Sequence, residues 1–356
     1  MPNKVKHGKR LYKQMAMEVA VRNPERYPEI LSVFAKHEGE VLDDNRILEI
    51  YKDLFTSRAI ESNKLDVDSA SDDDIKQFIK TSLSHNNEWG FPTGYQAAFT
   101  RYLKTLSELG FIYMQYNDRI AISETAKALL DKKLEVSEAF ALQCIRFWRK
   151  SPYRRVLNDF NYFSFVLKVL LKLKDAGHSL SYPQFILSLF SDDGDVDQFI
   201  DTISSIKLGN DIDAMYNYIL TKYSNIDELH PKVNKQQTVV NDYGNTVFRV
   251  LQLTGLISVE NKSGVLLISV NENRKDFLMY LLGENFTVTE DAKENEMLYF
   301  TEIGEITPQL IANIASYREP ESLVLTNYNA VLHKVICDYS ITEEKIVDMI
   351  KSITSD

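Results

Sequence analysis

The stretch from residue 91 to residue 130 limits the possible folds of this chain more than any other. Apolar side chains recur at helical spacing from Tyr95 to Leu109. Gly110 comes next, a residue type that ends helices because it adopts positive φ without strain. Two short strand-like runs follow at 111–114 and 120–122, and a polar turn joins them. The stretch therefore predicts a helix followed by a β-hairpin.

Ser123 then has the side chain of a helix cap, and a further helix is predicted to begin at Glu124. A helix followed by a hairpin is the core of a winged helix, a helix-turn-helix variant that lays one helix in the major groove of DNA. The alternative is a small α+β fragment without a nucleic-acid partner, since similar modules also bind proteins.

A second copy of this pattern lies further along the chain. Residues 160–174 have a nearly continuous apolar helical face, and Ser181 caps the next predicted helix. Residues 236–253 form another amphipathic pattern, which ends at Gly255 and precedes a hairpin over 256–268. We therefore predict a mainly α chain with small β-hairpins, an α+β fold built from tandem winged-helix, helix-turn-helix-like subdomains.

These patterns divide the chain into five predicted segments. They are an N-terminal helical segment (1–60), a first winged-helix subdomain (61–135), a basic helical connector (136–160), a second winged-helix subdomain (161–283) and a C-terminal α/β segment or linker toward a nuclease (284–356). Within the first segment, Asn23 and Pro24 form a helix start, with Asn as the cap and Pro at the first helical position.

Composition restricts the cellular setting. Hydrophobic residues make up 44% of the chain and charged residues 26%, as in ordinary globular proteins. No apolar run reaches the length of about 18 residues that a membrane helix needs, and the first ten residues do not form a secretory signal. The two cysteines, Cys144 and Cys337, lie far apart, which favours a reducing compartment. We expect a cytoplasmic, bacterial, nucleoid-associated protein without a membrane partner.

The formal net charge of −10 opposes DNA binding, because affinity for DNA depends mainly on phosphate electrostatics. The distribution of charge matters more than the sum. Residues 1–26 carry seven basic and two acidic side chains, and residues 142–157 carry five basic and no acidic ones. The acidic residues gather in two other runs, at 66–74 and 192–197. The two basic clusters are therefore candidate phosphate contacts, with solvated helix faces as the alternative.

Three segments, in this order, resemble type IIS restriction endonucleases of the AlwI family and the related nicking endonucleases. The first is Arg-Asn-Pro-Glu-Arg at 22–26, continuing to Glu-Gly at 38–39. The second runs from 97 to 111 and on to 122–126, where Ala126 stands at a position that is usually Gly in the family. The third includes 165–167, 180–181 and then 248–255. The resemblance extends over roughly residues 20–285.

This resemblance implies a sequence-specific recognition module for double-stranded DNA that reads a short asymmetric site. In such enzymes a separate nuclease domain follows and cuts at a fixed distance. The present chain ends where that domain is expected, so the resemblance predicts a nuclease that is absent or supplied in trans. The implied partners are duplex DNA, a nuclease subunit and a cognate methyltransferase system. DNA binding needs no cofactor, and Mg²⁺ is expected only with a nuclease domain of this chain or of a partner.

A nuclease of this type needs acidic side chains that converge on Mg²⁺. One set, Asp242, Glu260 and Lys262, lies on the predicted DNA-reading helix and wing, which explains those residues better. A second set, Asp291, Glu302 and Glu305, flanks a strand-like run at 298–301 and supplies the catalytic candidates. The segment after residue 283 is too short for a complete nuclease core.

Polar residues on the outward faces of the two predicted reading helices are the candidate base contacts, because Arg pairs with guanine and Asn or Gln with adenine. Basic residues of the connector are the candidate phosphate contacts, and the wing tips add others. The predicted DNA-binding residues are Gln96, Thr100, Arg101, Lys104, Asn117, Arg119, Arg146, Arg149, Lys150, Arg155, Gln237, Asn241, Asn245, Arg249 and Lys262.

Two alternatives share parts of this interpretation. A winged-helix transcription regulator has the same fold but normally binds a palindrome as a symmetric dimer. A complete Mg²⁺-dependent nuclease would carry a small catalytic part near the C-terminus. A regulator would differ from the recognition module in binding a symmetric DNA site. A complete nuclease would differ from it in cutting DNA.

Overall fold

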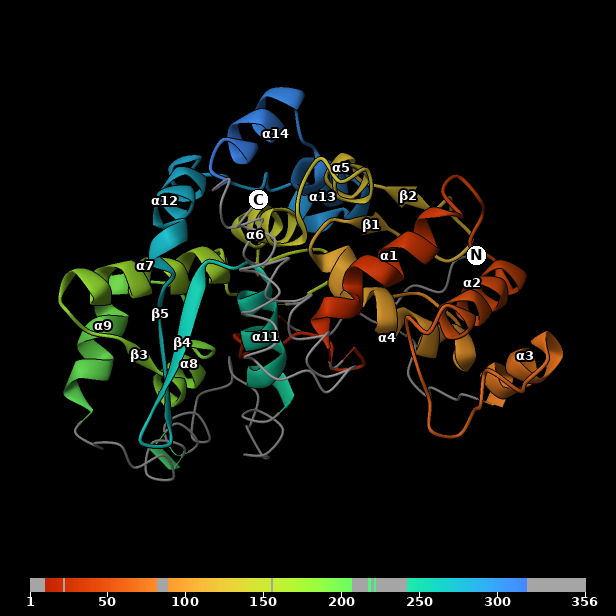
Figure 1. The fold of residues 1–356 in the computed structure, drawn as a ribbon, viewed down its shortest axis with the longest axis horizontal. Helices are drawn as coiled ribbons and strands as arrows, with labels where there is room; N and C mark the ends of the chain where they lie inside the picture. The colour runs from red at the N-terminus through yellow and green to blue at the C-terminus, as the bar shows by residue number, and fades with distance from the viewer. Residues whose placement is uncertain are drawn as a thin grey trace, which may run out of the picture. The chain divides into compact units, whose positions relative to one another are not determined.

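The structure is a computed structural model that describes residues 10–21, 23–81, 89–154, 156–206, 217–218, 221 and 242–318. The chain divides into two compact units, residues 1–307 and 308–356. The first unit is rich in helices and contains two small antiparallel sheets (Figure 1). The α+β class predicted from the sequence is confirmed.

The first half of this unit begins with a short 3₁₀ helix, η1 (Pro24–Arg26), which continues into α1 (Tyr27–Ala35). The Asn23 side chain accepts a hydrogen bond from the Glu25 amide, as the predicted helix start requires. The following helices are α2 (Asp44–Thr56), α3 (Asp72–Thr81) and α4 (Tyr95–Glu108). The hairpin of β1 (Ile112–Tyr113) and β2 (Ala121–Ile122) comes next. Helix α4 and this hairpin are the helix and hairpin predicted from the pattern at 91–130.

An extended segment before α2 pairs with the turn of this two-stranded hairpin. Val41 forms an antiparallel bridge with Arg119. The Leu42 amide donates to the Asp118 carbonyl at 2.9 Å, and the Ile120 amide donates to the Glu40 carbonyl at 2.9 Å. The hairpin is therefore joined to residues that precede α2, and the first repeat begins at α1, ahead of the boundary predicted at residue 61.

The second half has the same order of elements. It contains α7 (Tyr162–Asp175), β3 (Leu180–Ser181), α8 (Tyr182–Ser188), α9 (Val196–Ser205), α11 (Asn245–Leu253), β4 (Ile257–Lys262) and β5 (Val265–Val270). The three strands form an antiparallel sheet in the order β3-β5-β4. The predicted cap at Ser181 is confirmed, since its hydroxyl accepts from the Gln184 amide. The helix predicted over 236–253 is described only from residue 242 onward, because residues 236–241 lie outside the described residues.

Each half thus consists of a helix, a short extended segment (the strand β3 in the second half), a second helix, an insertion, a third helix and a hairpin. The third helices are α4 and α11, and each ends at a glycine with positive φ, Gly110 (+70°) and Gly255 (+67°). In Figure 1, α11 lies between the α7–α9 group and the α1–α4 group. It packs against η1 and against α6 (Val136–Arg146).

Two further helices connect the halves, α5 (Glu124–Leu130) and α6, and Ser123 caps α5 through the Ala126 amide as predicted. After the second hairpin come η3 (Glu272–Arg274), α12 (Lys275–Gly283), η4 (Ala292–Glu294) and α13 (Glu296–Gly304). The strand predicted at 298–301 is wrong, because these residues lie in α13. A short apolar run cannot distinguish a strand from a buried helix turn, and the Asn295 side chain caps the helix here.

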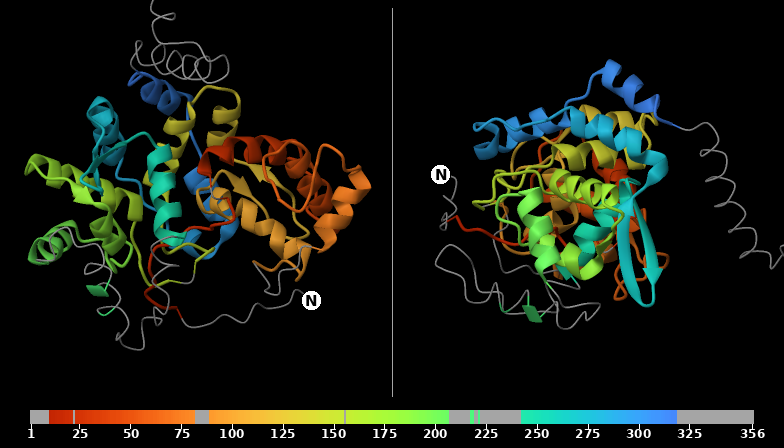
Figure 2. Two further views of the ribbon diagram at one scale, coloured as in Figure 1. Left: turned by 60° about the horizontal axis from the view of Figure 1, so that its bottom comes forward. Right: turned by 90° about the vertical axis from the view of Figure 1, so that its left-hand side faces the viewer.

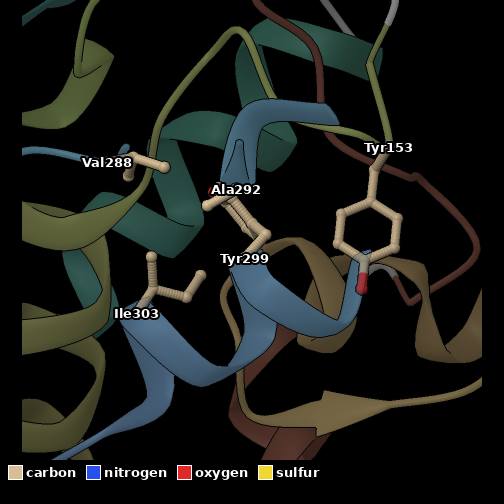
Figure 3. Packing of buried hydrophobic residues seen from close by; sticks show 5 residues of the cluster. All are labelled: Tyr153, Val288, Ala292, Tyr299 and Ile303. Atoms are coloured by element: carbon tan, nitrogen blue, oxygen red, sulfur yellow. The ribbon is translucent and has the colours of Figure 1, made fainter. Parts of the chain in front are cut away.

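Helix α13 is part of the core of the first unit. Its residues Tyr299 and Ile303 pack with Tyr153, Val288 and Ala292 (Figure 3). A Cβ atom at Gly304 would lie 2.8 Å from the carbonyl oxygen of Gly110, so only glycine allows this approach. The segment predicted to start at residue 284 therefore contributes to the first unit up to residue 307.

The second unit is described only over α14 (Pro308–Ala315) and the three residues that follow it. Among the described helices, none has the length and apolar character needed to cross a membrane. Cys144 is a buried free thiol, and Cys337 lies outside the described residues.

Candidate nucleic-acid interface

Helix α11 carries a stripe of exposed polar side chains. Asn245, Arg249 and Gln252 are exposed, and their spacing of four and three residues places them on one face of the helix. The opposite face is buried, with Val247 and Leu251 fully inaccessible. This pattern holds the helix on the core and leaves a polar edge open, as a DNA-reading helix requires.

The stripe borders a polar groove. Two of its residues, Arg249 and Gln252, line a hollow of about 440 Å³, together with Asn23, Pro24 and Glu25 of the η1 start and with Leu253 and Gly255. Asn23 also lines a neighbouring hollow of about 560 Å³. The remaining lining of that second hollow is Ala20, Val21, Arg26, Ala59, Ile60, Glu61, Asn63 and Tyr102.

We call the two hollows together the polar groove. It runs from α11 past η1 to Tyr102 of α4, so both third helices contribute to it. The left-hand view of Figure 2, where the bottom of Figure 1 is turned forward, shows α11 between the α7–α9 group and the α1–α4 group. Arg26 pairs with Glu61 at 3.0 Å within the groove.

Helix α4 does not present the face that the sequence predicted. Thr100 is only 1% exposed, and its hydroxyl donates to the Ala97 carbonyl at 2.8 Å. The predicted role of Thr100 as a base contact is wrong, because Thr100 is among the nine buried residues of the fourteen in α4. Lys104 is half-buried, with its ammonium 5.4 Å from the centre of the Trp89 ring.

Gln96 and Arg101, the other two predicted contacts on α4, differ in whether another part of the chain occupies them. Gln96 donates to an Asp44 carboxylate oxygen at 3.0 Å, so its amide is occupied by the start of α2. Arg101 is half-exposed and lies 3.8 Å from the Glu18 carboxylate. Arg101 is therefore the residue of this set that a DNA backbone can still reach.

The basic connector is mostly internal. Arg149 is 1% exposed and donates to the backbone carbonyls of Ser191 (2.8 Å) and Lys13. Burial lowers the pKa of its guanidinium to about 9, so it remains charged at neutral pH. The predicted phosphate contact at Arg149 is wrong, because this side chain fixes the segment around Lys13 to the core.

Arg146 and Lys150 are also engaged within the protein. Arg146 donates to the carbonyls of Ile303 (3.2 Å) and Glu305, and burial lowers the pKa of its guanidinium to about 10. Lys150 is half-buried between the carboxylates of Asp159 (3.4 Å) and Glu290 (3.2 Å). Both were predicted as phosphate contacts, and the structure gives their charges internal partners. Arg155, Gln237 and Asn241 lie outside the described residues.

The large aromatic residues among the basic residues of the connector are the sequence feature that could have predicted the burial of those basic side chains. Phe147 is fully buried, and Arg154, which donates to the buried Glu108 carboxylate at 2.6 Å, stacks over the Phe147 ring. Basic residues interleaved with large aromatics are as consistent with a packed core as with a nucleic-acid surface.

The two hairpins differ in reach. The first has two-residue strands, and its tip is tied down, since Arg119 donates to the Gly39 carbonyl at 2.6 Å. Asn117 at this tip is exposed and has a φ of +63°. The second has six-residue strands joined by a two-residue turn in which Ser263 and Gly264 both have positive φ.

Lys262 stands at the end of the second hairpin and is 62% exposed, with the Glu260 carboxylate 3.2 Å away. The long second hairpin can therefore reach a neighbouring molecule, whereas the short first one is held against the segment before α2.

The catalytic candidates do not form a metal site. The Glu302 carboxylate accepts hydrogen bonds from both the amide and the hydroxyl of Thr289. The backbone carbonyl of Glu305 accepts a hydrogen bond from the Arg146 guanidinium. Within the described part of the chain, no three His, Cys, Asp or Glu side chains gather in a way that could hold a metal. Asp291, Glu302 and Glu305 therefore do not fit Mg²⁺, and neither do Asp242 and Glu260 in the other set.

Three polar residues that line the hollow beside α11, namely Gln252, Asn23 and Glu25, were not among the predicted contacts. Gln252 follows Arg249 by three residues, so helical periodicity alone could have identified it. Asn23 and Glu25 were recognised only as a helix start. Their place opposite α11 depends on tertiary packing, which a local pattern does not contain.

A comparison with protein families places the chain among restriction endonucleases. The chain belongs to the AlwI restriction endonuclease family, because the sequence model of that family matches residues 107–353. The match confirms the resemblance noted in the sequence. The matched region begins at residue 107, after the first similar segment at 22–39. It continues past residue 285, where the resemblance ended, to residue 353.

Among solved structures, the chain is similar to one described as pyrene- and phenanthrene-modified DNA in complex with the BpuJ1 endonuclease binding domain. The identity is 13%, the alignment covers 82% of this chain and 97% of that one, and the TM-score is 0.47. No curated protein gives a significant match.

Proposed function

We propose that this chain recognises a short asymmetric site in double-stranded DNA as the reading part of a type IIS restriction endonuclease. The observation that carries the proposal is the exposed stripe of Asn245, Arg249 and Gln252, which borders the polar groove in a chain of the AlwI family. In this proposal the chain supplies recognition of DNA, and cleavage by a nuclease is a separate activity that is tested below.

In this proposal each half of the first unit is a winged-helix subdomain, with α4 and α11 as the third helices and the hairpins as wings. The order of helices and the β3-β5-β4 sheet support this assignment. The stripe on α11 runs over eight residues, from Asn245 to Gln252, so it rises about 10 Å along the helix axis, the length of roughly three base pairs.

The chemistry of the stripe defines what it can read. Arg249 can pair in a bidentate way with the edge of a guanine, and Asn245 or Gln252 with an adenine. Each such pair contributes about 1–3 kcal/mol of discrimination. Lys262 and Arg101 are exposed basic residues that would contact phosphates and fix the register without reading sequence.

The two halves present different residues, so a single chain has no twofold symmetry to impose on its site. An asymmetric DNA sequence is the matching target, whereas a dimeric winged-helix regulator would select a palindrome. This difference separates the proposal from the regulator.

The test is selection from a pool of randomised duplexes with the full chain, followed by titration of the enriched site at several salt concentrations. We expect one short, non-palindromic motif and an affinity that falls with salt. Binding without any enriched motif, or a palindrome occupied by two chains, would contradict the proposal.

A second experiment addresses the nuclease. Supercoiled plasmid that carries the enriched site is incubated with the chain and Mg²⁺. We expect no nicking by this chain alone, and we expect chelation of divalent metal to leave DNA binding unchanged, since recognition needs no cofactor. Nicking that depends on Mg²⁺ would show instead that the chain contains a complete nuclease.

A further inference from the structure

Glu25 is an unexpected residue for a DNA-binding groove. Its side chain is exposed and lines the same hollow as Arg249 and Gln252. A carboxylate beside a duplex is repelled by the phosphates, so a favourable role for it requires a hydrogen-bond donor on the DNA. In the major groove the exocyclic amino group of cytosine is the donor that Glu and Asp side chains accept from.

The local backbone fixes where Glu25 lies. Asn23 caps η1 through the Glu25 amide, Pro24 is buried at the first helical position, and α11 packs directly against η1. The carboxylate therefore borders the groove from a short, packed helix rather than from a loose loop. A base contact gains specificity when its side chain is held on a rigid element in this way.

We infer that Glu25 is a specificity-determining residue that reads a cytosine next to the base read by Arg249. The inference rests on the proposed DNA-recognition function and extends it from α11 to η1. The recognised site would then contain a guanine and a cytosine within the few base pairs that face the polar groove.

The test compares Glu25→Ala, which removes the hydrogen-bond acceptor, with Glu29→Ala. Glu29 is an exposed residue of α1 four positions further along the chain and does not line the groove, so both variants lose one negative charge. Each variant and the unaltered chain are titrated against the selected site and against duplexes with a single changed position. Thermal unfolding of all three proteins shows that they remain folded.

We expect the unaltered chain to lose about tenfold or more in affinity when the critical cytosine is replaced. Glu25→Ala should reduce that difference to about twofold, because the acceptor has gone, and should strengthen binding to unrelated DNA, because a repulsive charge has gone. Glu29→Ala should keep the full discrimination at every position.

Two results would overturn the inference. If Glu25→Ala keeps the same discrimination as the unaltered chain at every position, Glu25 reads no base. If its effect falls only on positions other than cytosine, the proposed chemistry is wrong. Failure of the proposed function has a different signature, because the unaltered chain would then enrich no site at all.

Discussion

The third helices of the two halves, α4 and α11, have equivalent places in the chain but opposite surroundings. Aligned on the glycines that end them, Gly110 and Gly255, they show the same polar positions. The equivalent pairs are Thr100 with Asn245, Lys104 with Arg249, and Ser107 with Gln252. The three residues on α11 are exposed, whereas Thr100 and Ser107 are buried and Lys104 is covered by Trp89.

The residues that cover α4 come from distant parts of the chain. Arg154 of the connector pairs with Glu108 at the end of α4, and the Tyr299 hydroxyl of α13 donates to the Glu108 carbonyl at 3.3 Å. At the equivalent position α11 has Leu253, which borders the polar groove. The comparison shows that a repeated local pattern fixes the helix, while tertiary contacts decide which face is available for binding.

The largest expected effect is the loss of the buried ion pair that holds α4. Glu108→Ala removes the partner of Arg154, whose charge then remains in the core without compensation, at a cost of about 3–5 kcal/mol of unfolding free energy. Leu253→Ala at the equivalent place on α11 should cost about 1 kcal/mol, since that side chain is only half-buried. Denaturant unfolding measures both. Equal losses would contradict the difference between the two helices.

Alkaline pH tests a feature that the halves share. Tyr27 and Tyr162 begin the first helix of each half, and burial raises the pKa of both phenols above the ordinary value near 10. Their contribution to stability is therefore complete below pH 10 and is lost as the pH rises through 10 toward the folded pKa. At pH 11 each should cost about 1.4 kcal/mol of unfolding free energy.

Unfolding midpoints between pH 8 and pH 11 provide the measurement. Tyr27→Phe and Tyr162→Phe should each flatten the pH dependence by a similar amount. If one variant flattens it and the other does not, the first helices of the two halves are not equivalent.

Exchange of the equivalent residues Thr100 and Asn245 gives an effect of similar size on one helix and almost none on the other. Thr100→Asn places a larger polar side chain in a packed core and should cost about 1–3 kcal/mol of unfolding free energy. Asn245→Thr is a surface change and should stay within about 0.5 kcal/mol. Urea unfolding distinguishes them, and a neutral Thr100→Asn would mean that this face of α4 is open after all.

The smallest predicted effects compare the two hairpins. Lys262→Ala should weaken binding to all DNA sequences slightly and reduce the salt slope by about 1, because one phosphate contact is lost. Arg119→Ala should leave binding unchanged and cost about 1 kcal/mol of stability, through loss of its hydrogen bond to the Gly39 carbonyl. A change in salt slope from Arg119→Ala would show that the first hairpin also reaches DNA.

Local signals in the sequence predict the elements well. Helix spacing, the glycines at 110 and 255 and the caps at Asn23, Ser123 and Ser181 identify α4, both hairpins, α5 and α8. These features depend on neighbouring residues, and so a single sequence contains them. The family was also visible in the order of short segments along the chain.

Features that depend on long-range contacts were missed. The sequence did not predict that residues 39–42 form backbone hydrogen bonds with residues 117–120 of the first hairpin. The apolar run at 298–301 was ambiguous between strand and helix, and Arg149 resembles an exposed phosphate contact until its burial is known. For the same reason, the sequence did not place Asn23 and Glu25 beside α11 in the polar groove.

The most direct test of the account compares Arg249→Ala with Lys104→Ala, the same truncation at equivalent positions of the two third helices. Both are titrated against the selected duplex and its single-position variants. We predict that Arg249→Ala loses about 5- to 150-fold in discrimination at one position. Lys104→Ala should keep the full sequence preference. If Lys104→Ala loses the preference while Arg249→Ala retains it, α11 is not the reading helix and the account is contradicted.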